Sequence, residues 1–370
     1  MNKELTYWLA FAHVPKIKTI KKNEIIIQLF EQGKTVIDFF ESEYSFWEDK
    51  YQLNKLEVEL FLDAKKELSN YAFMVEDLFE HGYNILPITS QDYSPILKKN
   101  LGRTSSPPVI YTKGNIQIMK EKSVAIVGAR MANDISLEFT DNVAKNASEH
   151  YKVVVSGFAK GVDKQALDSA LKYKGQSIIV LPQGITTFQS GFKKHYKQII
   201  DGDILVLSTF YPKAPWSVPL AMARNSIIYG LATEIYVAES SEKGGTWSGV
   251  IDGLKKSRII YVRKPYPREK NANNILISKG GKAVDIEGNL IPEVQNKSKS
   301  IVSESELKTT EEKIMELLKQ GSFSAKKIVN ILKIDWTPRK VSNFLKNRKD
   351  VSIKKGKPLK FSVKDKTLFD

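Results

Sequence analysis

The chain has 370 residues, of which 42% are hydrophobic, which is long enough for roughly two or three domains, and it has no cysteine, which excludes disulfides and thiolate metal sites. It contains no run of about 18 apolar residues and no metal-ligand spacing among its four histidines, so we expect a cytoplasmic protein with neither a membrane partner nor a metal. A net charge of +15 favours a polyanionic partner such as nucleic acid, although a lysine-rich proteome would raise the charge in the same way.

The first 85 residues are predicted to form a helical domain. An apolar stripe at helical spacing begins with Leu5, Trp8 and Leu9, and the segments 25–30 and 56–62 continue the pattern. Residues 84–115 are rich in proline and serine, which predicts a mostly extended connecting segment.

Six short apolar runs then predict a parallel sheet. They lie at 123–130, 151–157, 176–182, 203–210, 233–240 and 257–264. Amphipathic stretches of helical length, such as 137–150 and 163–174, separate them. Strands that are apolar on both faces and alternate with helices indicate an α/β domain over 86–290, with a doubly wound parallel sheet. Its ligand is expected at the carboxyl ends of the strands.

The end of the chain predicts a linker over 291–307 and a winged helix over 308–370. Three short helices are expected before two strands that flank a Lys-Gly-Lys-Pro turn. Residues 301–370 carry 17 Lys and Arg against 9 Asp and Glu, a net charge of +8. The segment 337–349 would be the recognition helix, and the wing at 354–360 would touch phosphates. The side chains predicted to contact duplex DNA or a protein partner are Arg339, Lys340, Lys346 and Arg348.

Four turns that favour anions follow the predicted strands. In the stretch SGFAKGVD, glycine lets the backbone approach an anion, Lys160 adds a point charge, and Asp163 is expected to cap the next helix. The other three turns contain Arg130, the helix start Arg224-Asn225, and the glycine-rich sequence Gly244, Gly245 and Thr246. Each turn also has a purely structural explanation, because tight strand–helix connections need glycine and a lone arginine commonly forms a surface ion pair.

Motifs of cofactor-dependent enzymes are missing from the sequence. Neither a G-x-G-x-x-G fingerprint nor a P-loop is present, and no Ser/His/acid order or converging carboxylate pair stands out. We therefore expect no cofactor and no catalytic residue. Glu239 and Glu242 are the sole candidates for a general acid or base.

The order and spacing of these motifs resemble the DNA-processing protein A family, called DprA or Smf. The resemblance is carried by VAIVGAR, VVVSGFAKGVDKQALDSAL, GQSIIVLPQGI, ARNSIIYGLA, VAESSEKGGTWSG and NNILISKGGKAV. It implies an extended Rossmann-like core that binds single-stranded DNA without cutting it, an N-terminal helical domain of the SAM-like type and a winged helix. It also implies a homodimer that protects incoming strands during natural transformation and helps to load a RecA-type recombinase.

The resemblance further implies which residues bind the DNA. The phosphate-binding residues would be Arg130, Ser156, Gly157, Lys160, Gly161, Lys193, Lys194, Arg224 and Asn225. Phe188 and Phe192 would stack on bases, so that binding tolerates any sequence and weakens with salt.

Two departures from the family pattern leave other functions open. Ser226 stands where the family has a second arginine, and the turn Lys243-Gly244-Gly245-Thr246 is similar to that of nucleotide-processing Rossmann proteins. A second hypothesis is therefore a sensor or hydrolase of a nucleotide-like small molecule, in a defence or mobile-element context. A third is an interaction module whose winged helix recruits partners.

Overall fold

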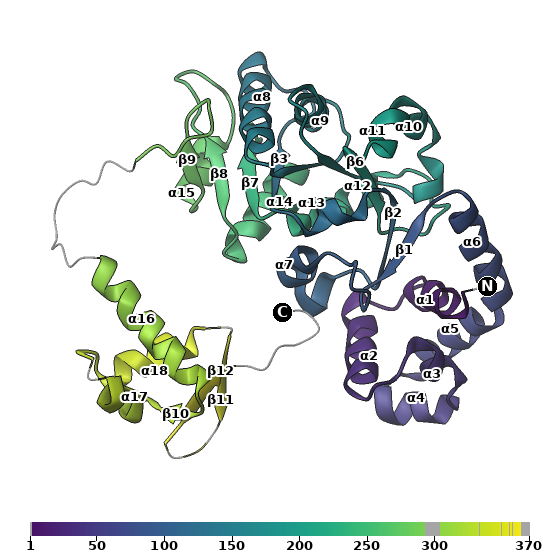
Figure 1. Ribbon diagram of the computed structural model, residues 1–370, viewed down its shortest axis with the longest axis horizontal. Coiled ribbons are helices and arrows are strands. Elements are labelled where there is room, and N and C mark those ends of the chain that lie inside the picture. The colour runs from purple at the N-terminus through teal and green to yellow at the C-terminus, as the bar shows by residue number, and fades with distance from the viewer. Residues whose placement is uncertain are drawn as a thin grey trace. The chain divides into compact units, whose positions relative to one another are not determined.

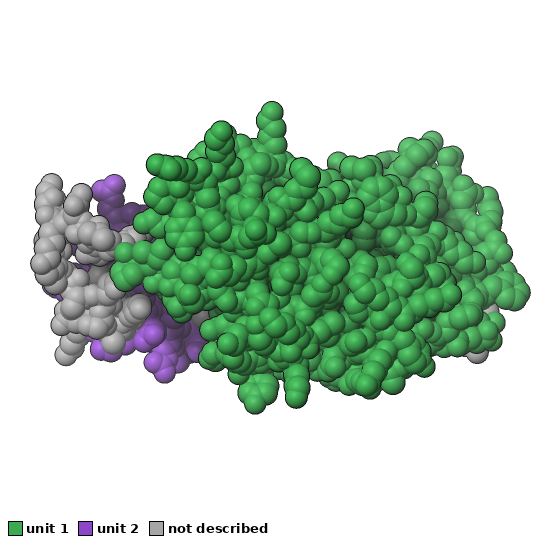
Figure 2. All heavy atoms as spheres, turned by 90° about the horizontal axis from the view of Figure 1, so that it is seen from above, with its two compact units in different colours: residues 1–292, 368–370 green, residues 293–367 purple. Residues whose placement is uncertain are grey.

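The computed structural model describes residues 2–292, 304–332, 334–348, 350–354, 356 and 358–363 (Figure 1). The chain divides into two compact units, one made of residues 1–292 with 368–370 and the other of residues 293–367 (Figure 2). Most of the predicted linker 291–307 lies outside the described residues. Within the described ranges, no helix is both long enough and apolar enough to cross a membrane.

Six helices form the N-terminal part of the first unit, as the sequence predicts. They are α1 (Lys3–Ala12), α2 (Thr19–Glu31), α3 (Val36–Glu41), α4 (Tyr44–Tyr51), α5 (Lys55–Lys66) and α6 (Leu68–Glu80). Thr35 and Asn54 begin α3 and α5 with capping boxes, which satisfy the first amides of each helix. The rings of Phe11, Phe39 and Phe61 pack edge-on or tilted at their centre.

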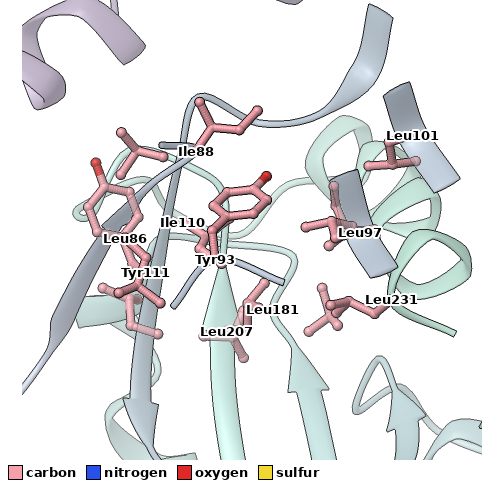
Figure 3. Packing of buried hydrophobic residues seen from close by; sticks show 14 of the residues in the cluster. Leu86, Ile88, Tyr93, Leu97, Leu101, Ile110, Tyr111, Leu181, Leu207 and Leu231 are labelled. Atoms are coloured by element: carbon pink, nitrogen blue, oxygen red, sulfur yellow. The ribbon is translucent and has the colours of Figure 1, made fainter. Parts of the chain in front are cut away.

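The segment 84–115 is part of the sheet instead of a mostly extended connection. It forms β1 (Asn84–Pro87), α7 (Pro95–Ser105) and β2 (Val109–Gly114). Ser94 caps α7 and Pro95 occupies its first turn, where a missing N–H costs nothing. Figure 3 shows Tyr93 and Leu97 in the same buried cluster as Leu207 and Leu231. Strand β1 crosses the predicted domain boundary at residue 85, and one hydrophobic core contains residues from both sides of it. The boundary remains a proposal.

The central sheet has nine strands in the order β1-β2-β6-β5-β4-β3-β7-β8-β9. The seven strands β6, β5, β4, β3, β7, β8 and β9 run parallel to one another. Strands β1 and β2 are antiparallel and lie at one edge of the sheet. The bounds of the parallel strands are β3 (Ser123–Val127), β4 (Val153–Ser156), β5 (Ser177–Val180), β6 (Ile204–Ser208), β7 (Glu234–Val237), β8 (Ile260–Arg263) and β9 (Lys282–Val284). The doubly wound parallel sheet is confirmed, and its strand order reverses between β3 and β7.

Helices cover both faces of this sheet (Figure 1). On strand β3, Val124 and Ile126 pack in the cluster that contains α8 and α9, whereas Ala125 and Val127 pack in the cluster that contains α13 and α14. The helices that follow β2 along this unit are η1 (Ile116–Lys120), α8 (Asp134–Glu149), α9 (Val162–Lys172), η2 (Ile185–Thr187), α10 (Gln189–Lys194), α11 (Tyr196–Ile200), α12 (Val218–Ala223), α13 (Asn225–Leu231), α14 (Gly245–Lys255) and α15 (Asn273–Ser278).

The described residues of the second unit form three helices and a three-stranded antiparallel sheet of order β10-β12-β11. Its elements are α16 (Glu304–Lys319), β10 (Phe323–Ser324), α17 (Ala325–Leu332), α18 (Pro338–Lys346), β11 (Val351–Lys354) and β12 (Lys360–Val363). Ile314, Ile328 and Phe361 are buried in one small core. This order of elements is the one that a winged helix requires, and that assignment remains a proposal.

Candidate nucleic-acid interface

A pocket of about 520 Å³ opens where the strand order reverses. The loops after β3 and β7 leave the sheet toward opposite faces there, which creates a crevice at the carboxyl ends of the strands. One wall comes from Val127 at the end of β3 and from residues 128–131 after it, with Ala159, Lys160 and Asp163. Residues 239–241 and 243–246 after β7, together with α12, Arg224, α13 and Lys270, complete the lining. The pocket therefore lies where the sequence predicts a ligand.

The turn from β4 to α9 packs closely against Arg224 and against the loop after β3. The buried Ser156 hydroxyl donates to the Asp163 carbonyl at 2.6 Å. A Cβ on Gly157 would lie 1.4 Å from Nη1 of Arg224. Gly161 has φ +75°, and its Cβ would approach the carbonyl oxygens of Ala129 and Arg130 within 2.5 Å. None of these three predicted phosphate contacts lines the pocket, so the structure gives Ser156, Gly157 and Gly161 a role in holding the turn.

A buried ion pair supports the floor of the pocket. Both Nη atoms of Arg224 lie 3.4 Å from Oδ2 of Asp163, and both side chains are largely buried. Burial raises the pKa of Asp163, and Arg224 and the N–H groups of Ala159 and Gly157 partly offset that rise. Burial also lowers the pKa of Arg224, and Asp163 opposes that change. Asp163 lies in the first turn of α9, as the sequence predicts, and its carboxylate also pairs with Arg224.

Four exposed cations surround the mouth of the pocket. They are Arg130, Lys160, Lys243 and Lys270. Within the part of the chain that the structure describes, none of them forms a salt bridge. Lys270 was missed by sequence reasoning, and Lys243 was noted only as part of the glycine-rich turn. Lys270 lies in a loop that is held by the buried ion pair of Arg263 with the neighbouring Glu269, 2.6 Å apart. This contact forms only in the folded chain, so no local sequence pattern marks Lys270.

The glycine-rich turn after β7 presents the start of a helix to the pocket. Gly244 has φ +93° with no atom near its absent Cβ, and α14 begins without a side-chain cap. A Cβ on Gly245 would lie 2.4 Å from Nδ2 of Asn225, so glycine allows the two turns to meet. The Thr246 hydroxyl donates to the Gly128 carbonyl at 3.1 Å and joins this turn to the end of β3. The uncapped amides and the positive end of the α14 dipole favour an anion here.

Besides Asp163, a second carboxylate, that of Glu239, lines this cationic pocket. Oε2 of Glu239 accepts a hydrogen bond from the Ser136 hydroxyl at 2.9 Å and one from the Asn133 backbone N–H at 3.4 Å. Ser136 in turn accepts a hydrogen bond from Arg263 at 3.2 Å. Ser136 and Asn133, which hold Glu239, do not line the pocket, whereas Glu239 itself does.

The residues of the segment 188–194 do not join the pocket. Phe188 is buried and its ring packs edge-on against Phe158 and Phe192, at 5.1 and 5.4 Å between centroids. The predicted stacking of bases on Phe188 disagrees with this burial, since only 8% of the residue is exposed. Phe192 is half-buried against Tyr83, and Lys193 and Lys194 are exposed on α10. No residue of this segment lines the pocket.

In the second unit, Arg339, Lys340 and Lys346 are exposed on α18. Nζ of Lys340 lies 4.6 Å from the centre of the Trp336 ring. Arg348 instead forms an ion pair with Asp350 at 2.7 Å, which reduces the positive charge that it offers to a partner. Two lysines of the predicted wing, Lys355 and Lys357, lie outside the described residues.

The fold is a doubly wound α/β sheet, and exposed cations surround a pocket at the point where the strand order reverses. These features define the class of the protein. The pattern of the DNA recombination-mediator protein A family matches residues 84–295, more than half of the chain, and the chain belongs to this family.

Curated relatives carry the name DNA processing protein DprA. The protein of Streptococcus pneumoniae is 34% identical over 160 residues, which are 42% of this chain and 55% of that protein. The protein of Bacillus subtilis is 28% identical over 190 residues, which are 50% of this chain and 61% of that protein. The chain thus matches less than two thirds of the length of either relative.

The fold resembles that of a solved relative. The X-ray structure of DprA from Streptococcus pneumoniae aligns with a TM-score of 0.59 and 22% identity, over 77% of this chain and 95% of that one. This similarity extends to the fold alone.

Proposed function

We propose that the protein binds single-stranded DNA of any sequence during DNA processing and recombination, without cutting it. The observation that carries this proposal is the cation rim of the pocket, formed by Arg130, Lys160, Lys243 and Lys270. The family description and the relatives named DNA processing protein agree with it. Contacts to phosphates carry no sequence information, so this rim accounts for tolerance of any base.

The pocket supplies three kinds of anion contact. The exposed cations of the rim provide mobile positive charge, and the amides at the start of α14 provide fixed donors. Arg224 lines the floor, and its buried Nε–H has no hydrogen-bond partner within the described residues. A phosphate oxygen near this group would satisfy a donor that is otherwise costly to bury. Asn225 adds a side-chain amide at the same place.

The test is the affinity for a labelled poly-dT oligonucleotide at several salt concentrations. We expect the affinity of the wild type to fall as salt rises, and Lys160→Glu to lower it about tenfold or more. Lys99→Glu is the matched control, because Lys99 is exposed on α7 and does not line the pocket. Equal affinities of both variants and the wild type would show that the DNA binds elsewhere. Arg224→Ala is a poor test, because it also removes the partner of Asp163.

A second candidate function is recognition of a nucleotide-like small molecule. The observation in its favour is Glu239, whose carboxylate repels phosphate and is held in the pocket by Ser136 and Asn133. A ligand that combines phosphate with hydroxyl or amino donors would use both the cations and the carboxylate. Thermal-shift measurements with nucleoside mono- and diphosphates test this candidate, since a bound nucleotide raises the unfolding temperature.

The remaining partners are proposals that rest on the family. We infer a homodimer, which light scattering of the purified chain tests. We also infer contact with a RecA-type recombinase, which is tested by the rate of recombinase assembly on coated DNA. Exposed Arg339 and Lys340 on α18 support duplex DNA or protein as the partner of the second unit. Reversal of both charges would lower duplex affinity if DNA is that partner.

A further inference from the structure

We propose that an apolar lip of the pocket, formed by Met131, Trp216, Val218 and Met222, holds the bases of the bound strand. The inference rests on the proposed function and adds to it the surface that contacts bases. Met131, Val218 and Met222 line the same pocket as the cation rim and are 93%, 63% and 46% exposed. Trp216, two residues before Val218, is 53% exposed. Three exposed apolar side chains that line one pocket, with exposed Trp216 close to them in sequence, indicate a binding surface.

Helix α12 presents this lip. Its N-cap, Ser217, accepts a hydrogen bond from the Leu220 N–H at 3.4 Å, which fixes where the helix begins. Val218 and Met222 are four residues apart and therefore share one face of the helix. Ala221 is the residue of α12 that is buried. The helix ends at Arg224, which the pair with Asp163 holds in place. The lip is thus anchored directly beside the anion-binding floor.

The chemistry of the lip and the rim together matches a nucleic-acid strand. Phosphates suit the four cations, and the flat apolar faces of bases suit the neighbouring lip. Methionine is flexible and polarizable, so it adapts to purines and pyrimidines alike, and an exposed tryptophan stacks on any base. Met131 comes from the loop after β3 and directly follows Arg130, so this loop carries both a rim cation and a lip residue. In this proposal the lip takes the base-stacking role predicted for Phe188 and Phe192, neither of which lines the pocket.

The experiment compares two oligonucleotides of equal length, one of poly-dT and one with abasic sites, on the full chain. The abasic strand keeps every phosphate and lacks bases. The test variant is Trp216→Ala with Met222→Ala, and both side chains are exposed enough for truncation to leave the core intact. The control is Phe73→Ala, which truncates an exposed aromatic residue on α6, away from the pocket lining.

We expect the double variant to bind poly-dT about tenfold more weakly than the wild type and to bind the abasic strand unchanged. The salt dependence should stay the same, because the number of phosphate contacts stays the same. Equal losses on both strands, or no loss on poly-dT, would overturn the role of the lip while the proposed function stands. If the wild type binds neither strand, the proposed function fails and the lip proposal fails with it.

Discussion

Replacement of Arg224 by alanine should destabilise the first unit strongly, because it leaves Asp163 buried without its cation. Loss of one partner of a buried pair costs about 3–5 kcal/mol. Asp163 keeps its hydrogen bonds to the backbone N–H groups of Ala159 and Gly157, which favours the lower end of that range. Removal of the buried arginine stem adds about 1 kcal/mol. We therefore expect the free energy of unfolding to fall by about 3–4 kcal/mol.

The assay is urea unfolding followed by tryptophan fluorescence in a Trp336→Phe background. The other four tryptophans all lie in residues 1–292, so the signal then reports on the first unit. The matched control is Arg130→Ala, which removes an exposed arginine of the same pocket and should cost less than about 0.5 kcal/mol. A loss for Arg224→Ala as small as that of the control would refute the argument from the buried pair.

Gly157 provides an independent check of the same geometry. In Gly157→Ala the new Cβ would lie 1.4 Å from Nη1 of Arg224, so the guanidinium must leave its place. The single variant should therefore be destabilised, whereas Gly157→Ala added to Arg224→Ala should cost little more than Arg224→Ala alone. Such a double-mutant cycle should give a coupling of about 2–3 kcal/mol, and additive losses would contradict the contact.

Three further predictions follow from buried or constrained groups. Burial and Lys22 lower the pKa of His13 to about 3, so its contribution to stability is present above pH 6.5 and is lost as the pH falls toward 3. The free energy of unfolding should fall by about 2 kcal/mol between pH 7 and pH 5, and His13→Gln should reduce this fall. The same dependence of the unfolding free energy on pH in the variant and the wild type would contradict the role of His13. Glu239→Gln removes a negative charge from the pocket, so titrations should show a severalfold gain in affinity for poly-dT; weaker binding would assign the carboxylate to the ligand. Gly161→Ala should lower the unfolding midpoint more than Gly202→Ala, because both have positive φ but only Gly161 lacks room for a Cβ.

The alternation of apolar runs and amphipathic stretches was enough to predict the doubly wound sheet. Each of the six predicted strands is present, because a strand buried on both faces must be apolar at nearly every position. The helix start at Asn225 was also visible, since turn chemistry is local. The strands β1, β2 and β9 escaped prediction, because they are short and their place in the sheet depends on pairing with distant segments.

The sequence by itself determined which turns carry the glycines, Lys160 and Arg224, because positive φ and strand–helix turns are properties of a few consecutive residues. The tertiary structure alone decided what those residues touch. Arg224 meets Asp163 across 61 positions of the chain, and Lys270 reaches the pocket through a loop held by Arg263. Phe188 looked available in sequence and is buried by Phe158 and Phe192. Such contacts depend on how distant segments pack, and no pattern of neighbouring residues encodes them.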